Sequence, residues 1–114
     1  MNQIIYHITS RDEWDYAQIN HEYCSKTFAQ EGFIHCSYIH QLVTVANRFF
    51  RGQNNLVLLA IDRNEITSEI VDENLEGGTE LYPHLYGLLP ITAVTEVMNF
   101  PCNTDGGFSL PKQL

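Results

Sequence analysis

The chain has 114 residues, of which 44% are hydrophobic, and a formal net charge of −8. This size and apolar content predict a single domain over residues 1–114 with a hydrophobic core of its own. The six Lys and Arg residues are scattered, whereas nucleic acids and anionic membranes bind clustered basic residues, so we expect neither as a broad partner. The sequence has no apolar run of about 18 residues and no signal-type N-terminus, so we expect a cytoplasmic protein.

A strand and then a helix are predicted at the N-terminus. Residues 3–9 alternate weakly between apolar and polar side chains, which is typical of a strand. Ser10 and Glu13 match a capping box, in which the Ser oxygen accepts from the Glu13 N–H and the Glu side chain reaches back. A short helix should follow, with an inward face formed by Trp14, Ala17 and Gln18. Residues 22–30 show no clear period, and we expect them to cross the surface without regular structure.

A second strand is predicted over residues 33–37, and successive side chains of a strand point to opposite faces. The two faces then carry Phe33, His35 and Ser37 on one side, and Ile34 and Cys36 on the other. A second helix should follow this strand, because apolar side chains recur there at the spacing of a helical stripe. The stripe consists of Leu42, Val45, Ala46 and Phe49.

Strands dominate the second half of the chain. The continuous apolar run 56–61 predicts a strand that is buried on both faces, and residues 69–74 alternate as a further strand. A loop is expected at 75–79, and residues 82–87 lead into a last strand near 91–98. From about 101 to 114 we expect an irregular tail. This order of elements predicts an α+β domain and excludes a doubly wound sheet.

Three of the five histidines lie in predicted strands, which is an unusual place for a polar ring. A buried imidazole needs hydrogen-bond partners, so His7, His35 and His84 in one small sheet indicate a shared site. Glu73 is the best-placed acid, since it lies in a predicted strand instead of a turn. The alternative is that each ring is structural and bonds to the backbone, and that Glu73 is a solvated carboxylate at a sheet edge.

Metal binding and nucleophilic catalysis find less support. His35, His40 and His84 could ligate a metal ion, but no motif with metal-ligand spacing occurs, and we expect no metal site. Cys36 shares its strand face with Ile34, which indicates a small buried hydrophobe instead of a nucleophile.

Several strings of the sequence resemble the bacterial "domain of unknown function 952" family over nearly the whole chain. The most specific are Glu31-Gly32-Phe33-Ile34-His35-Cys36-Ser37 and Pro83-His84-Leu85-Tyr86-Gly87. The others, in order, are Ile5-Tyr6-His7-Ile8, Gln41, Ala46-Asn47-Arg48-Phe49-Phe50, residues 56–62, Glu73 and Asp105-Gly106-Gly107-Phe108.

The resemblance implies membership of the ADP-ribosyltransferase-like superfamily, with a compact split β-sheet, two short helices and a cleft that binds or cleaves NAD. Transferases of the H-Y-E type place a His, a Tyr and a Glu on three strands. His7 suits the first role and Glu73 the third, whereas His35 stands in the place of the Tyr. That departure is similar to the RNA 2′-phosphotransferase branch with its paired histidines, although the net charge of −8 argues against an RNA substrate.

From these arguments we expect a domain that binds NAD, ADP-ribose or a related phosphorylated nucleotide, and that could transfer ADP-ribose or cleave NAD. The expected catalytic residues are His7, His35, Glu73 and His84. The expected ligand-binding residues are His7, Phe33, Ser37, Arg48 and Tyr86. NAD would be a substrate, and no permanently bound cofactor is expected. The alternatives are a non-catalytic small-molecule sensor or interaction module with the same cleft and, more weakly, a metal-dependent enzyme.

Overall fold

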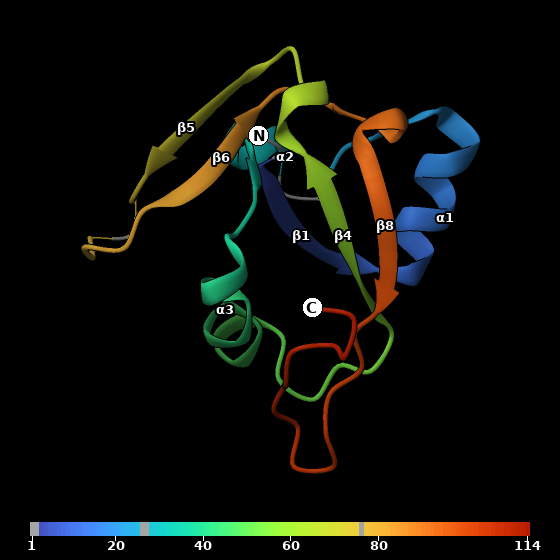
Figure 1. Ribbon diagram of the computed structural model, residues 1–114, viewed down its shortest axis with the longest axis vertical. Helices are drawn as coiled ribbons and strands as arrows, with labels where there is room; N and C mark the ends of the chain where they lie inside the picture. The colour runs from blue at the N-terminus through green and yellow to red at the C-terminus, as the bar shows by residue number, and fades with distance from the viewer. Residues whose placement is uncertain (1–2, 26–27, 76) are drawn as a thin grey trace.

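Three small antiparallel sheets form the framework of the computed structural model, which describes residues 3–25, 28–75 and 77–114 (Figure 1). The elements in chain order are β1 (Ile4–Ser10), α1 (Arg11–Asn20), β2 (Glu22–Tyr23), α2 (Phe28–Glu31), β3 (Ile34–His35), α3 (Leu42–Phe49), β4 (Leu56–Asp62), β5 (Glu69–Glu73), β6 (Tyr82–Tyr86), β7 (Leu89–Pro90) and β8 (Val94–Asn99). Short 3₁₀ turns occupy Ile39–Gln41, Arg63–Glu65 and Ile91–Ala93. The fold class is α+β, as predicted.

The sheets are connected through β1 and β3. In the largest sheet β4 lies between β1 and β8, in the second β6 lies between β3 and β5, and β2 pairs with β7. Tyr6 of β1 and Ser37, which follows β3, form an isolated antiparallel bridge. The Tyr6 N–H donates to the Ser37 carbonyl at 2.8 Å, and the Ser37 N–H donates to the Tyr6 carbonyl at 2.7 Å. This bridge holds the second sheet against the free edge of β1.

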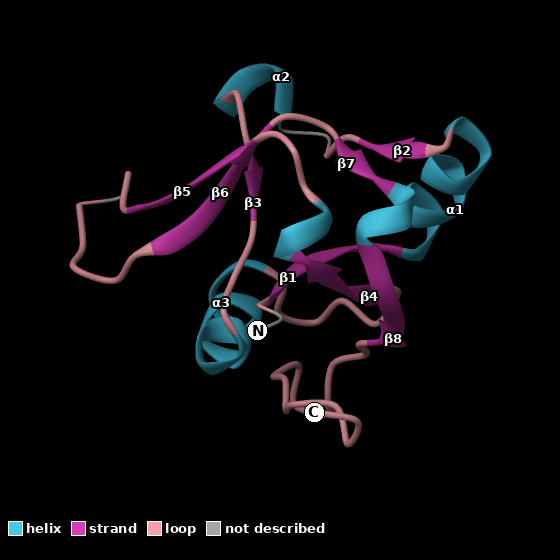
Figure 2. Ribbon diagram, turned by 45° about the horizontal axis from the view of Figure 1, so that its top comes forward, coloured by secondary structure: helices cyan, strands magenta, loops and turns pink. Residues whose placement is uncertain are grey.

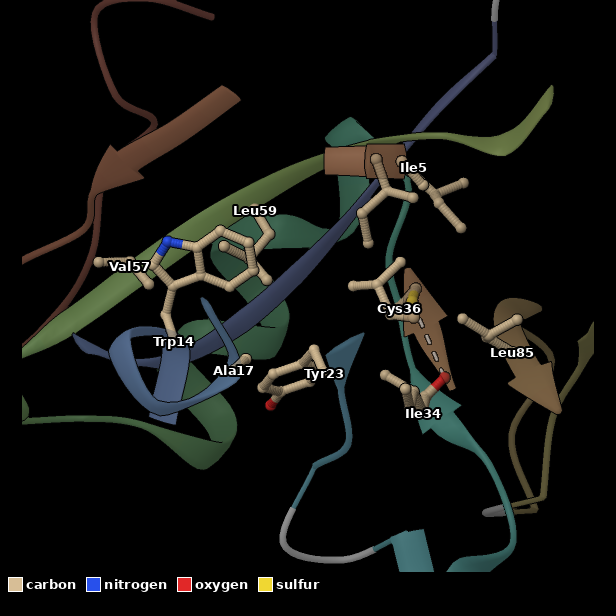
Figure 3. Close-up of a cluster of buried hydrophobic side chains, with 12 residues drawn as sticks. Ile5, Trp14, Ala17, Tyr23, Ile34, Cys36, Val57, Leu59 and Leu85 are labelled. Carbon is tan, nitrogen blue, oxygen red and sulfur yellow. Dashed lines mark hydrogen bonds between the residues drawn. The ribbon is translucent and has the colours of Figure 1, made fainter. Parts of the chain in front are cut away.

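The largest sheet separates two hydrophobic clusters, because alternate residues of β1 and β4 point to opposite faces. Helix α1 covers one face and α3 the other, as Figure 2 shows. The cluster on the α1 side includes Ile5, Trp14, Ala17, Val57 and Leu59, together with Tyr23, Ile34, Cys36 and Leu85 (Figure 3). The cluster on the α3 side includes Tyr6, Ile8, Leu42, Val45, Ala46, Leu58 and Ala60. The prediction that β4 is buried on both faces is therefore confirmed.

The two predicted helical faces are correct except at their edges. The Ser10 side chain caps α1 by accepting from the Glu13 N–H at 3.1 Å. Gln18 is exposed, contrary to the prediction, because α1 lies on the surface and buries only a narrow stripe. Phe49 is also wrongly placed in the core and is 51% exposed. Helix α3 ends at this residue, and the following residue, Phe50, packs against the core instead.

The remaining differences from the prediction concern short elements. Residues 22–30 contain β2 and α2, so α2 adds a third helix to the two expected, and residues 26–27 lie outside the described part of the chain. The last strand begins at Val94, because a 3₁₀ turn follows Pro90. The loop predicted at 75–79 is irregular where it is described, which excludes residue 76. The tail is irregular, as expected, but Phe108 is buried beside Phe100.

No helix among the described residues is long and apolar enough to cross a membrane.

Candidate functional site

A cavity of about 300 Å³ lies where β1 and β3 separate beyond the Tyr6–Ser37 bridge. The His7 side chain spans the gap between the two strands, and its Nδ1–H donates to the His35 carbonyl oxygen at 2.7 Å. The polar residues that line this inner cavity are His7, Thr9, Ser10, Glu13, Tyr23, Ser25, His35, Ser37 and Gln53. The inner cavity therefore combines polar and apolar walls, and it lies beside the bridge between the sheets.

Close polar contacts continue from His7 through three more side chains. The Tyr23 hydroxyl lies 2.8 Å from His7 Nε2 and donates to the Thr9 hydroxyl at 2.9 Å, and the Thr9 hydroxyl donates to Glu13 Oε2 at 2.5 Å. Because a carbonyl oxygen can only accept, Nδ1 of His7 carries a proton and Nε2 of the neutral ring is an acceptor. Burial lowers the pKa of His7 from 6.5 to about 4, although the hydrogen bond to the His35 carbonyl opposes this shift. At neutral pH His7 is uncharged.

A second hollow, of about 630 Å³, adjoins the first. We call this second hollow the outer groove. It shares three lining residues with the inner cavity, which are His35, Val45 and Phe50. The rest of the outer groove is formed by Glu31, Phe33, Phe49, Leu75 and His84. Gly32, with a φ of 81°, turns the chain from α2 into β3 and so separates Glu31 from the strand. The groove therefore has aromatic walls and two imidazoles.

His84 on β6 is held from two sides in the wall of the outer groove. Its Nδ1–H donates to Glu73 Oε2 at 2.9 Å, and the Phe33 ring stacks on it with centroids 3.9 Å apart and planes at 9°. The His35 ring lies 5.3 Å from the His84 ring, because the two residues pair across β3 and β6. His84 Nε2 is buried and has no hydrogen-bond partner among the described residues. In the neutral ring this nitrogen is an acceptor.

Glu73 lies behind His84, one hydrogen bond away from the groove. It accepts from the Tyr86 hydroxyl and from His84, and these two hydrogen bonds, Tyr86 first, lower its pKa. Neither Glu73 nor Tyr86 lines the inner cavity or the outer groove. Glu73 contacts the site through its hydrogen bond with His84. Tyr86 contacts it through the Phe33 ring, whose centroid is 5.5 Å from that of Tyr86.

The structure thus brings most of the predicted site residues together. His35 lies on both hollows, His7 and Ser37 line the inner cavity, and Phe33 and His84 line the outer groove. Arg48 lines neither of these hollows: its guanidinium is 5.0 Å from the ring centroid of Phe49, which lines the outer groove, and it lines a separate hollow with residues 77–80. Its predicted role in ligand binding gains no support from this position.

Sequence reasoning missed the residues that surround His7. Tyr23 is only 1% exposed, but its segment has no periodicity that would have predicted burial. Thr9 could have been found, because it shares the strand face of His7 by period-2 spacing. Glu31 and Phe50, which line the outer groove, lie in strings that carry the family resemblance, but neither was among the expected site residues.

The described residues contain no group of three or more His, Cys, Asp or Glu side chains that could hold a metal ion. His40, which the metal alternative requires, has a side chain that is 69% exposed and lies 3.2 Å from Glu80. Cys36 is fully buried in the core, as expected for a small hydrophobe, and burial raises its pKa to about 12. A thiol in this state is no nucleophile at neutral pH.

Fold and site together define an α+β domain with a histidine-lined hollow. Residues 8–97 match the family described as "Protein of unknown function (DUF952)", and the chain belongs to this family. It is similar to the crystal structure of protein CC0527 from Caulobacter crescentus, with 37% identity, 95% of each chain covered and a TM-score of 0.86. The solution NMR structure of that protein gives a TM-score of 0.83 at 37% identity, with 97% of this chain and 96% of that chain covered. No curated protein matches the chain.

Proposed function

We propose that the chain binds NAD, ADP-ribose or a related phosphorylated nucleotide in the outer groove, where NAD cleavage or ADP-ribosyl transfer can follow. The observation that carries this proposal is the arrangement of His84. Glu73 fixes its tautomer, so Nε2 is an acceptor that no described residue satisfies. An unpaired buried acceptor costs about 1–3 kcal/mol. A hydroxyl of a ligand, such as that of a ribose, would satisfy it once the groove wall moves to expose this buried nitrogen.

The walls of the groove support a ligand with a flat ring. Phe33 already stacks on His84, which orients both rings, and Phe49, which is about half exposed, also lines the groove. Flat rings gain about 0.5–1.5 kcal/mol from such aromatic neighbours beyond the area they bury. A volume of about 630 Å³ is within the usual range for sites of small molecules and cofactors.

In a reaction at this site, each residue would have a limited role. His84 Nε2 is placed to accept or return a proton, and His35 lies beside it on the same wall. Cleavage at a ribose carbon builds positive charge on the sugar, which a nearby carboxylate stabilises. Glu73 is separated from the groove by His84, so in this proposal it positions His84 and does not contact the ribose.

The position of Glu73 is also what favours the alternative function, a non-catalytic sensor that binds the same ligands. Without a carboxylate at the sugar, the groove keeps its binding features but loses one means of stabilising the transition state. In that case ligands bind without any release of nicotinamide.

The proposal is tested by a binding screen and an activity assay on the intact chain. NAD, ADP-ribose and 2′-phosphorylated sugars are titrated while backbone amide NMR signals are followed, and nicotinamide release from NAD is measured. We expect binding shifts near Phe33, His35 and His84. Glu73→Gln should reduce nicotinamide release, whereas Glu69→Gln, an exposed acid on the same strand, should not.

Three outcomes of these experiments are informative. Binding shifts that avoid these three residues would refute the site. Binding with no nicotinamide release would establish the sensor and refute the enzyme. Release that is equal in both variants would refute the role of Glu73.

A further inference from the structure

The tail that follows β8 is hydrogen-bonded to the turn between α3 and β4, and the two segments lie side by side in Figure 1. We call residues 102–108 of this tail the latch. The Gly52 N–H donates to the Gly106 carbonyl at 2.9 Å, and the Cys102 N–H donates to the Gln53 carbonyl at 3.3 Å. Gly106 has a φ of 86°, so the latch has a backbone shape that side chains larger than glycine would strain.

Two side chains from α3 and its C-terminal turn add to this contact. Asn47 Oδ1 accepts from the Phe108 N–H at 2.9 Å, and the Arg51 guanidinium donates to the Asp105 carbonyl at 3.0 Å. Phe108 is buried, and its ring centroid lies 5.0 Å from that of Phe100. The latch therefore ends in the hydrophobic cluster on the α3 side of the largest sheet.

The turn that the latch contacts is also a wall of the inner cavity. Phe50, Gln53 and Leu56 line this cavity, together with the buried His7. Gln53 is exposed, Phe50 is half-buried and Leu56 is buried, so the turn lies between the cavity and solvent. Residues 50–53 belong to no helix or strand, whereas His7 lies in β1, which is paired within the largest sheet. The turn is therefore the wall that can move without breaking a sheet.

We propose that the latch controls access to the inner cavity: when residues 102–108 leave α3, the turn at 50–53 moves outward and the cavity opens to solvent. Local opening of this kind needs less free energy than global unfolding, because the three sheets stay paired. A small molecule from solvent then reaches His7 and Tyr23, which line the cavity. This inference concerns the inner cavity, and it does not depend on which ligand binds in the outer groove.

The opening is measured by the reaction of His7 with diethyl pyrocarbonate, which acylates neutral imidazoles. His7 is the one histidine before Arg11, so trypsin releases it in the peptide 1–11, where limited labelling is read by mass spectrometry. His21 is exposed and serves as the internal standard. We expect His7 to react much more slowly than His21 at neutral pH, because it reacts only while the latch is open.

Three variants test the role of the latch. Asn47→Ala removes the acceptor of the Phe108 N–H, and it should speed both the acylation of His7 and the hydrogen exchange of the Phe108 amide about tenfold. Asn47→Asp keeps an accepting oxygen and should restore both rates. Thr44→Ala, at an exposed position of the same helix, is the matched control and should leave both rates unchanged.

A fourth variant separates opening of the latch from unfolding of the whole chain. Ile61 is fully buried in the cluster on the α1 side, so Ile61→Val destabilises the chain without touching the latch, and it should leave the acylation of His7 unchanged. If Ile61→Val speeds this acylation as much as Asn47→Ala does, His7 is reached by global unfolding and the inference is overturned. Faster exchange of the Phe108 amide in Asn47→Ala without faster acylation of His7 would also overturn it, because the tail would then open without opening the cavity.

Discussion

His7 is a buried histidine whose removal should change how the stability of the protein depends on pH. Its ring donates to the His35 carbonyl, contacts the Tyr23 hydroxyl and is only 7% exposed. His7→Gln replaces the ring with a group that keeps polar atoms but does not titrate. The variant should lose some stability at neutral pH, because Gln cannot reach both partners in the same geometry.

The magnitude follows from the pKa of His7, which burial lowers from 6.5 to about 4. At a pH above the pKa of His7 in the unfolded chain, the ring is neutral in both the folded and the unfolded state, so its contribution to stability is fully present. As the pH falls from about 6.5 to about 4, the unfolded chain takes up a proton that the folded chain does not, and the folded state loses stability. The complete loss is about 3 kcal/mol, of which about 2.5 kcal/mol appears between about pH 7 and about pH 4.5.

Urea unfolding at a series of pH values measures this difference. The stability of the wild-type chain should fall more steeply on acidification than that of His7→Gln, so that the gap between them narrows or reverses. His40→Gln removes a histidine whose side chain is 69% exposed, and it should follow the wild-type curve. Parallel curves for wild type and His7→Gln would refute the reasoning, because they would mean that the buried ring binds its proton as readily as an exposed one.

Two further predictions concern Tyr23 and the cap of α1. Tyr23→Phe removes the buried hydroxyl that donates to Thr9 and lies beside His7 Nε2, and it should cost about 1–3 kcal/mol in urea unfolding. Tyr16→Phe, at an exposed position, should be nearly neutral, and equal costs would refute the hydrogen bond to Thr9. Ser10→Ala removes the cap of α1 and should cost about 1 kcal/mol, seen as a lower midpoint with an unchanged slope, whereas Ser10→Asp should keep most of the stability.

Local sequence patterns were sufficient for the faces of the strands. The period of two in residues 33–37 correctly placed Ile34 and Cys36 in the core, with Phe33, His35 and Ser37 on the side of the two hollows. The apolar run 56–61 likewise identified a central strand. These predictions succeed because a side chain's direction along a strand is set by its own backbone, which needs no knowledge of distant residues.

The tertiary structure alone decided which distant groups meet. The Tyr6–Ser37 bridge creates the opening that His7 spans, and β2 carries Tyr23 to that opening although nothing in its segment indicates burial. The pairing of β5 with β6 places Glu73 behind His84, one hydrogen bond from the groove, and Arg48 of α3 lines a separate hollow. Such contacts depend on how sheets and helices that are far apart in the sequence pack together. The periodicity of apolar residues within one element does not predict that packing. The sequence determined which residues are able to form a site, and the packing of the elements determined which of them do.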